Sequence, residues 1–247
     1  MARLAGKKIV ITGGTGGMGL VTAKYFLAEE AEVLVTGSSE LTVASARSEL
    51  GTTAFVERSD TSVLSDIDTL ATTVKERLGA IDLLFVNAGV TKYEPFESAT
   101  EEVYDRLTNI NVKGAYFTVQ KLAPLIVDNG AVIFTTSVVN VKGLAGLSVY
   151  SANKTAVRSM TRTIARELLP RGIRVNAISP GPIETGILDR SMPAEAAEQT
   201  KAGMIANNPM KRFGTADEIA RAVDFLGFDA TFTTGAELTV DGGAGQL

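Results

Sequence analysis

Short apolar runs alternate along the chain with longer segments of helical periodicity. Several runs are apolar on consecutive residues rather than on alternate ones, which is typical of strands covered on both faces. The chain has seven candidate strands in all: KKIVIT, AEVLVT, TTAFVE, IDLLFVN, AVIFTTS, IRVNAIS and AELTV. Since strands that alternate with helices form parallel sheets, the pattern predicts a doubly wound, three-layer α/β/α sandwich around a mostly parallel seven-stranded sheet.

No linker, repeat or low-complexity tract divides residues 1–247, and we therefore expect a single domain. One long interruption of the alternation spans about 183–213, where prolines flank a polar helical stretch. Long excursions of this kind often cover a binding site, so we expect a substrate lid there.

The amino-acid composition argues against several classes of partner, namely nucleic acids, membranes and metals. With 24 Lys and Arg against 28 Asp and Glu, the net charge is −4 and no basic cluster stands out, so no nucleic-acid partner is expected. The apolar run near the N-terminus is too short for a signal peptide or a membrane span, which predicts a cytoplasmic protein with no membrane partner. The chain has no Cys and no His, which excludes disulfides and argues against a metal site.

A glycine-rich loop follows the first predicted strand. ITGGTGGMGL places Gly13, Gly17 and Gly19 at the spacing G-x-x-x-G-x-G and opens a helix. Glycines permit a tight turn and a close approach of the backbone to a phosphate, and a helix N-terminus favours an anion. The loop is therefore interpreted as a dinucleotide-binding site rather than an ordinary turn between strand and helix.

Without His or Cys, proton transfer falls to carboxylates, hydroxyls, phenols or amines. Tyr150 and Lys154 stand four positions apart in a helical pattern, so their side chains share one face of the helix. The Lys154 ammonium is expected to stabilise the phenolate and lower the pKa of Tyr150. Ser137 ends a predicted strand and can bring its hydroxyl beside the phenol. Taken alone, however, a Tyr/Lys pair at this spacing is more often only local helix support.

Further motifs follow in order along nearly the whole chain. They are Asp60 after the third strand, NAG at 87–89, Asn111, PG at 180–181 and DGG at 241–243. Together with the loop and the Ser, Tyr and Lys residues, they make the sequence resemble the short-chain dehydrogenase/reductase family, whose loop reads T-G-x-x-x-G-x-G. The resemblance implies a Rossmann-type fold and hydride transfer between a nicotinamide and a ketone or secondary alcohol.

The same resemblance implies a catalytic tetrad of Asn111, Ser137, Tyr150 and Lys154. Tyr150 would donate the proton to the carbonyl oxygen in reduction, or remove it in oxidation, while Ser137 hydrogen-bonds that oxygen. Lys154 would also bind the nicotinamide ribose, and Asn111 would hold a water that links Lys154 to solvent. Because the nicotinamide itself transfers the hydride, the protein needs only to bind and orient the cofactor and the substrate and to provide a suitable electrostatic environment.

The resemblance also assigns cofactor contacts. Asp60 would meet the adenine ring, although an acidic residue after a strand can equally cap the next helix. Asn87 would tie neighbouring strands together, while Ile183 and Thr185 hold the carboxamide. The complete set of expected contacts is Gly13, Thr15, Gly17, Met18, Gly19, Gly37, Ser38, Ser39, Asp60, Thr61, Asn87, Ala88, Gly89, Tyr150, Lys154, Pro180, Gly181, Ile183 and Thr185.

The end of the second strand predicts NADP(H) rather than NAD(H). An enzyme that uses NAD typically has an acidic side chain there, which binds the ribose hydroxyls and repels a 2′-phosphate. This chain has Gly37, followed by Ser38 and Ser39, whose hydroxyls can donate to a phosphate. The arginine usual in NADP-binding relatives is missing, so the alternative is that the serines only cap the next helix and both cofactors are tolerated.

The substrate is expected to be a neutral, rather hydrophobic ketone or secondary alcohol, because the candidate pocket residues are mostly apolar. They are Val139, Leu144, Leu147, Pro182, Ile187 and Met192. A non-catalytic dinucleotide sensor or scaffold on the same fold is the alternative function. Reduction of a carbon–carbon double bond is a weaker alternative, since the enoyl reductases of this superfamily separate their Tyr and Lys by more residues. By resemblance, we expect a homotetramer built through the helices that carry Asn111 and Tyr150.

Overall fold

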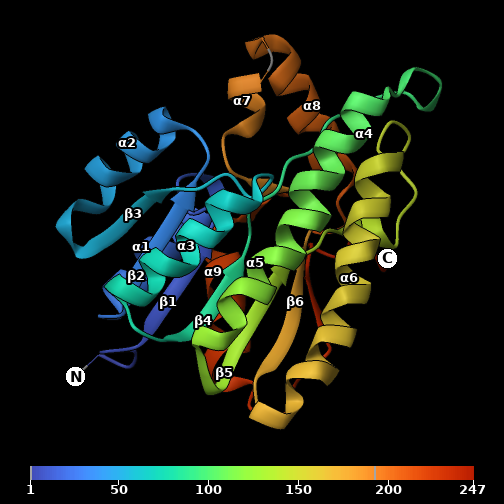
Figure 1. The fold of residues 1–247 in the computed structure, drawn as a ribbon. Coiled ribbons are helices and arrows are strands. Elements are labelled where there is room, and N and C mark those ends of the chain that lie inside the picture. Colours follow the sequence, from blue (N-terminus) through green and yellow to red (C-terminus); the bar gives the residue numbers. More distant parts are fainter. Residues whose placement is uncertain (1, 192) are drawn as a thin grey trace.

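The computed structural model describes residues 2–191 and 193–247. Its centre is a seven-stranded sheet in the order β3-β2-β1-β4-β5-β6-β9, with every neighbouring pair parallel (Figure 1). The predicted seven-stranded α/β fold is therefore confirmed. The strands are β1 (Lys8–Thr12), β2 (Glu32–Gly37), β3 (Ala54–Arg58), β4 (Ile81–Val86), β5 (Ile126–Thr135), β6 (Arg174–Pro180) and β9 (Glu237–Val240).

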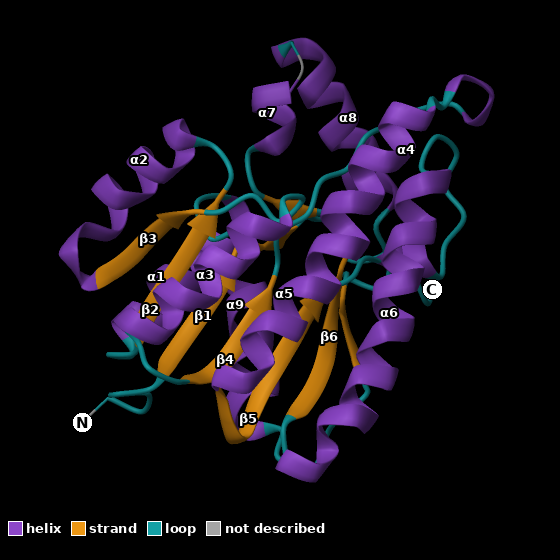
Figure 2. Ribbon diagram, viewed as in Figure 1, coloured by secondary structure: helices purple, strands orange, loops and turns teal. Residues whose placement is uncertain are grey.

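Helices cover both faces of the sheet (Figure 2). One core cluster lies between the sheet and α1 (Gly17–Ala28), α2 (Glu40–Leu50) and α9 (Ala216–Asp224). The cluster on the opposite face includes side chains of α3 (Leu64–Arg77), α5 (Ala115–Leu122) and α6 (Ser148–Leu168), and α4 (Glu101–Thr108) packs against α6. Short 3₁₀ turns lie at Gly51–Thr53, Phe96–Ser98, Ala123–Leu125, Val138–Asn140 and Leu169–Arg171, and π-helical turns at Asn109–Gly114 and Phe225–Asp229.

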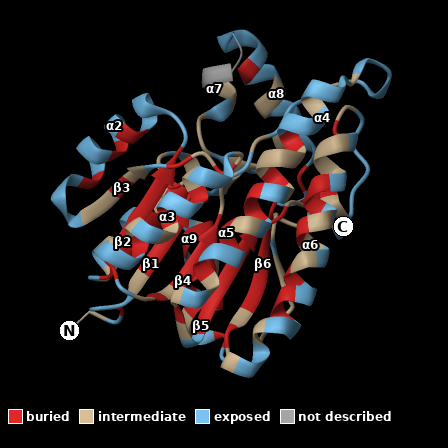
Figure 3. Ribbon diagram, viewed as in Figure 1, coloured by how far each residue is buried: buried red, intermediate tan, exposed pale blue. Residues whose placement is uncertain are grey.

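Strand β1 illustrates why the strands are apolar on consecutive residues. Ile9 and Ile11 belong to one core cluster, Val10 to the other, and all three are fully buried. Successive side chains of a strand point to opposite faces, so a strand between two helical layers must be apolar on both. Figure 3 shows the buried residues concentrated along these central strands.

The segment after β6 departs from the alternation, as the sequence predicts. It contains α7 (Ile187–Ser191) and α8 (Ala194–Asn207), between the short parallel strands β7 (Ile183–Glu184) and β8 (Gly214–Thr215). Both helices stand beyond the carboxyl ends of the central strands (Figure 1). Nothing in the described part of the chain forms a helix long and apolar enough to cross a membrane.

Candidate active site

The glycine-rich loop joins β1 to α1 at the carboxyl edge of the sheet. Gly13 and Gly17 have positive φ angles of 64° and 51°, a region that favours glycine. A Cβ atom on Gly13 would lie 2.8 Å from Cα of Ala88, and one on Gly19 would lie 2.3 Å from the carbonyl oxygen of Gly13. Among the described residues, no side chain caps the N-terminus of α1, so its first N–H groups can meet an anion.

Asn87, directly after β4, holds three neighbouring strand ends together. Its Nδ2 donates to the carbonyl oxygens of Thr12 and Gly13 at 3.3 and 3.1 Å. Its Oδ1 accepts from the hydroxyl of Thr135 at 3.2 Å. These bonds join β1, β4 and β5 where the glycine-rich loop begins, in agreement with the predicted tie between strands.

Two adjoining cavities follow the carboxyl edge and share Gly89, Val90 and Arg106 in their walls. The first, about 470 Å³, is lined by nine of the expected cofactor contacts: Gly13, Thr15, Gly37, Ser38, Ser39, Asp60, Thr61, Ala88 and Gly89. The second, about 560 Å³, includes the expected contacts Met18, Asn87, Gly89, Tyr150 and Lys154 and the pocket candidate Ile187. A glycine-lined cleft of two halves beside an open helix N-terminus fits a dinucleotide.

The remaining expected contacts lie outside the walls of these two cavities. Thr185 faces the loop, since a Cβ on Gly17 would lie 3.6 Å from it. Gly181 packs against the backbone of Asp241, where a Cβ would lie 2.7 Å from the Asp241 Cα. The side chain of Ile183 turns away toward Gly214 and the wall of a separate cavity, so any cofactor contact of this residue would fall to its backbone.

Tyr150 and Lys154 lie one turn apart on α6, as predicted. The side chain of Lys154 is buried, and its Nζ donates to the carbonyl oxygen of Thr135 at 2.8 Å. The same nitrogen lies 5.6 Å from the centre of the Tyr150 ring. Ser137 follows the end of β5, and its hydroxyl hydrogen-bonds the phenol of Tyr150. The structure thus brings three of the four tetrad residues together.

The predicted lowering of the Tyr150 pKa is wrong for this arrangement. Burial of the phenol raises the pKa of Tyr150 to about 12, and the hydrogen bond with Ser137 acts in the opposite direction without overcoming it. Burial also lowers the pKa of Lys154 to about 8. The physical reason is that Nζ of Lys154 is directed to the Thr135 carbonyl, while desolvation disfavours the charged form of both groups.

Asn111, the fourth residue, lies in the π-helical turn between α4 and α5. Its side chain binds the backbone of Val90 twice: Nδ2 donates to the Val90 carbonyl at 2.8 Å, and Oδ1 accepts from the Val90 N–H at 2.9 Å. A Cβ on Gly89 would lie 3.0 Å from this Oδ1 and 3.4 Å from Nζ of Lys154. Asn111 therefore belongs to the same site, with its side chain positioning the segment after β4.

The first cavity holds several hydroxyl groups. The hydroxyl of Thr15 donates to that of Thr42 at 3.2 Å, and sequence reasoning missed Thr42 because it lies inside α2. Asp60 serves a turn, since its Oδ1 accepts from the N–H and the hydroxyl of Ser62 at 2.9 and 2.7 Å. The alternative that Asp60 caps the next helix is wrong, because the N-cap of α3 is Val63 and has no side-chain hydrogen bond; Asp60 closes the preceding turn and also lines the cavity.

A third cavity, about 620 Å³ and largely apolar, lies between the segment after Ser137 and the α7–α8 segment. Two predicted pocket residues, Leu144 and Pro182, line it. Val139 and Leu147 are instead buried and do not line it, and Met192 lies outside the described residues. Sequence reasoning missed these lining residues: Tyr93, Val138, Lys142, Leu188 and Met204. A search for apolar residues alone could not find a lysine.

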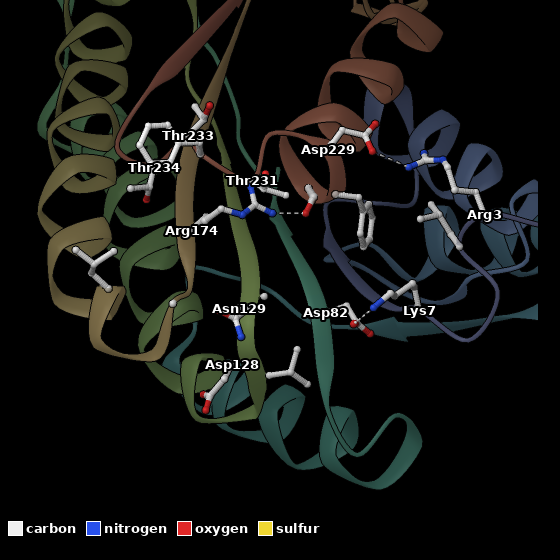
Figure 4. Close-up of a pocket in the computed structure, with 18 residues that line it drawn as sticks. Arg3, Lys7, Asp82, Asp128, Asn129, Arg174, Asp229, Thr231, Thr233 and Thr234 are labelled. Atoms are coloured by element: carbon white, nitrogen blue, oxygen red, sulfur yellow. Dashed lines mark hydrogen bonds and ion pairs between the residues drawn. The ribbon is translucent and has the colours of Figure 1, made fainter.

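A larger cavity of about 990 Å³ lies at the amino ends of the strands, away from the tetrad (Figure 4). Its charged groups pair with protein groups. Arg3 binds Asp229 at 3.3 Å, Lys7 binds Asp82 at 2.8 Å, and the Arg174 guanidinium donates to backbone carbonyls. The cavity therefore has a structural character, in contrast to the glycine-lined cleft.

Comparisons with known proteins agree with this site. A family model described as Enoyl-(Acyl carrier protein) reductase matches residues 13–245. Levodione reductase of Leifsonia aquatica is 36% identical over 257 residues, which cover 98% of this chain and 95% of that protein. The 3-oxoacyl-(acyl-carrier-protein) reductase FabG of Thermotoga maritima is 34% identical, with 98% of each chain covered. The crystal structure of levodione reductase has a TM-score of 0.88 at 32% identity and covers 98% of this chain and 99% of its own.

The chain belongs to the short-chain dehydrogenase/reductase family. The family implies an oxidoreductase that uses a nicotinamide dinucleotide and a small-molecule substrate.

Proposed function

We propose that the protein is a ketoreductase that transfers a hydride between NADP(H) and a ketone or secondary alcohol, with Tyr150 as acid and base. One observation carries the proposal. The Tyr150 phenol, hydrogen-bonded to the Ser137 hydroxyl, and the buried ammonium of Lys154 meet in a cavity that adjoins the glycine-lined cleft. This is the arrangement that carbonyl reduction requires: two hydroxyl groups to bind an oxygen and a cation near the proton donor.

When bound, the nicotinamide supplies or accepts the hydride. The hydroxyls of Ser137 and Tyr150 hold the carbonyl oxygen, and Tyr150 passes its proton to that oxygen as negative charge develops there. Lys154 contributes positive charge and two further N–H donors beyond the one used by Thr135. Asn111 fixes Val90 and so the wall between the two cavities.

The pKa values favour reduction near neutral pH. With a pKa of about 12, the Tyr150 phenol carries its proton at pH 7 and is ready to donate it. Oxidation of an alcohol needs the phenolate, so its rate is expected to increase as the pH rises above neutrality. Initial rates of both directions between pH 6 and about pH 10 measure this difference.

Two other functions remain as alternatives. The family model carries the description of an enoyl reductase, but Tyr150 and Lys154 lie a single helical turn apart, which favours ketone reduction. A dinucleotide sensor on the same fold would bind NADPH without turnover. A panel of ketones, secondary alcohols and enoyl thioesters, assayed with NADPH and NADP, separates the three functions.

Tyr150→Phe tests the mechanism. The variant loses only the phenolic hydroxyl, so kcat/KM should fall about a thousandfold while the Kd for NADPH changes little. Tyr116→Phe, half exposed on α5 and outside both cavities, is the matched control once light scattering shows that its oligomeric state is unchanged. Retention of more than a small fraction of the wild-type rate in Tyr150→Phe would contradict the assignment.

The preference for NADP(H) rests on the groups around the end of β2. Ser39 caps α2 without a side-chain hydrogen bond, which leaves its hydroxyl for a ligand, and Ser38 and Thr42 lie in the same cavity. A cation near this strand end, Arg58, is the register partner of Gly37 on β3, although it does not line the cavity. Its guanidinium lies 3.5 Å from Glu40 and 3.2 Å from Asp66 at the rim of this region.

An aspartate at position 37 is the test of cofactor choice, but it needs room. A Cβ on Gly37 would lie 2.2 Å from Oγ1 and 2.8 Å from Cγ2 of Thr15. Gly37→Asp is therefore combined with Thr15→Ala, which removes both atoms, and Thr15→Ala alone is the control. The double variant should shift the ratio of kcat/KM for NADPH over NADH by about tenfold toward NADH, because the carboxylate repels a 2′-phosphate. A wild type that already prefers NADH would overturn the proposal.

The homotetramer also stays a prediction. Tyr104 on α4 and Tyr116 on α5 are half exposed on the helices expected to form subunit contacts. Light scattering that finds a monomer at micromolar concentration would contradict it. The cytoplasmic location likewise stays a prediction.

A further inference from the structure

The apolar cavity beside the tetrad is lined by one charged side chain, which is unexpected in a wall that is otherwise mostly apolar. Lys142 belongs to its wall, together with Val138, Leu144, Leu188 and Met204. Among the described residues, no other Lys or Arg and no Asp or Glu lines this cavity. Lys142 is itself solvent-exposed, so it places a single positive charge where the apolar wall meets solvent.

Lys142 is held at this wall by its backbone and by its side chain. Its N–H donates to the carbonyl of Val138 at 3.1 Å, which closes the turn directly after Ser137. Its Nζ donates to the carbonyl of Ala244, another residue of the cavity wall, at 3.0 Å. The position of the ammonium is thus set by two chain segments that are far apart in sequence.

Within the described part of the chain, no protein counterion pairs with this ammonium. An ammonium has three N–H donors, and the Ala244 carbonyl takes one of them. Asp241 lies on the same turn, but its carboxylate oxygens accept from the N–H groups of Gly243 and Gly245 at 2.8 and 2.7 Å. Over residues 2–191 and 193–247, no ion pair within 4.0 Å joins a carboxylate to Lys142. Two donors and a full charge remain for solvent or a ligand.

The cavity is next to the reacting groups. Val138, in its wall, directly follows Ser137. Leu188, also in its wall, follows Ile187, which lines the cavity of Tyr150. The walls of the two cavities share no residue, so a ligand whose carbonyl meets Tyr150 has to pass these neighbouring side chains to reach Lys142.

We propose that the substrate is an oxo acid whose carbonyl meets Tyr150 and whose carboxylate, separated from it by an apolar segment, binds Lys142. The inference rests on the proposed ketoreductase function and reverses the neutral substrate expected from the apolar residues alone. A wholly apolar substrate would remove water from the ammonium without replacing its hydrogen bonds, which disfavours binding. A carboxylate supplies both the charge and the acceptors.

A phosphate fits this wall less well than a carboxylate. A phosphate monoester carries up to two negative charges and three strong acceptor oxygens near neutral pH. One lysine in an apolar wall offers two donors and one charge. The balance of charge therefore favours a monoanionic carboxylate.

The experiment compares each acid with its own neutral ester. A series of (ω−1)-oxo carboxylic acids of increasing chain length and their methyl esters is assayed with NADPH, and the ratio of kcat/KM for acid over ester is measured. Wild type should prefer the acid at one chain length. Lys142→Met, which keeps an apolar side chain of similar length, should reduce that ratio about fivefold, and Lys142→Glu should invert it. Lys75→Met, an exposed lysine on α3, is the control.

Equilibrium binding separates this inference from the function on which it rests. Calorimetric titration of acid and ester into the NADP-loaded protein needs no turnover. The carboxylate site would be overturned if Lys142→Met lost the same affinity for the acid and for the ester. It would also be overturned if the wild type bound both with equal affinity. Acid-selective binding that depends on Lys142, without turnover of any ketone, would overturn the ketoreductase function and leave the carboxylate site standing.

Discussion

Two cations lie at opposite ends of the central sheet, the buried Lys154 and the partly buried Arg174, and their surroundings differ. Arg174 begins β6 at the amino edge, where its guanidinium donates to the carbonyls of Leu226, Gly227 and Ala230. Lys154 lies at the carboxyl edge, where its Nζ donates to one carbonyl, that of Thr135. Burial lowers the pKa of both groups.

The difference separates a structural cation from one that we propose to be functional. At the amino edge, the Arg174 guanidinium donates to carbonyl groups at the C-terminal end of a helix. These carbonyls have no partner within the helix, so the guanidinium has a structural function. At the carboxyl edge, two N–H donors of Lys154 remain in a cavity with Tyr150. A buried charge with unused donors is costly to stability, and such a cost is typical of functional sites.

Of the substitutions that test this comparison, Lys154→Met should produce the largest effect, and it should act in opposite directions on activity and stability. We expect kcat/KM to fall at least about a hundredfold, because the charge beside the phenol is lost. At pH 7 the free energy of unfolding should rise by about 1–2 kcal/mol, since relief from burying the ammonium exceeds the cost of leaving the Thr135 carbonyl unpaired. Enzyme assays and urea unfolding of the same preparations measure both.

The pH dependence of this stability difference sharpens the test. The pKa of Lys154 is about 8 in the folded protein, against an ordinary value of 10.5. Between these values the unfolded chain binds the proton and the folded chain does not, so wild-type stability gains as the pH rises. The advantage of Lys154→Met should therefore be complete below about pH 8 and vanish by about pH 10.5. An advantage that does not change with pH would mean that the ammonium is not the cause.

Arg174→Met should show the reverse pattern. Loss of the guanidinium leaves three carbonyls without this donor, and we expect the free energy of unfolding to fall by about 3 kcal/mol. The turnover of the folded fraction should stay within about twofold of wild type because Arg174 lies at the far edge of the sheet. Arg166→Met, exposed on α6, is the control for loss of an arginine. A variant as stable as wild type would remove the contrast between the two edges.

Glu237→Gln should produce the smallest effect, because it probes a structural ion pair at the functional edge. One carboxylate oxygen of Glu237 accepts from Nδ2 of Asn140 at 2.6 Å, and the other lies 3.0 Å from Nε of Arg158. We expect a loss of about 1 kcal/mol in the free energy of unfolding and a decrease in kcat of about threefold or less. Glu49→Gln, which removes an exposed pair with Lys24, serves as the reference. A hundredfold loss of kcat would place Glu237 among the functional groups instead.

Local patterns in the sequence predicted the sheet and the shared helical face of Tyr150 and Lys154, whereas Asn111 was assigned only through the family resemblance. Apolar runs located the central strands because each strand is buried on both faces, and the apolar positions of 148–168 located α6. β5 begins earlier than its apolar run, since Ile126 pairs with Ile81 across a shift in register. Such a shift depends on the neighbouring strand, so the run alone could not indicate it.

The sequence by itself determined which residues could do chemistry here: no His, no Cys, a glycine-rich loop, and Tyr150 with Lys154 on one helical face. These follow from chain composition and from the periods of helix and strand, which are local. Only the tertiary structure decided that Lys154 turns to Thr135, that the pKa of Tyr150 rises, and that Lys142 joins the apolar cavity. Desolvation and contacts between segments that are distant in sequence depend on the packing of the whole chain, so a local sequence pattern cannot predict them.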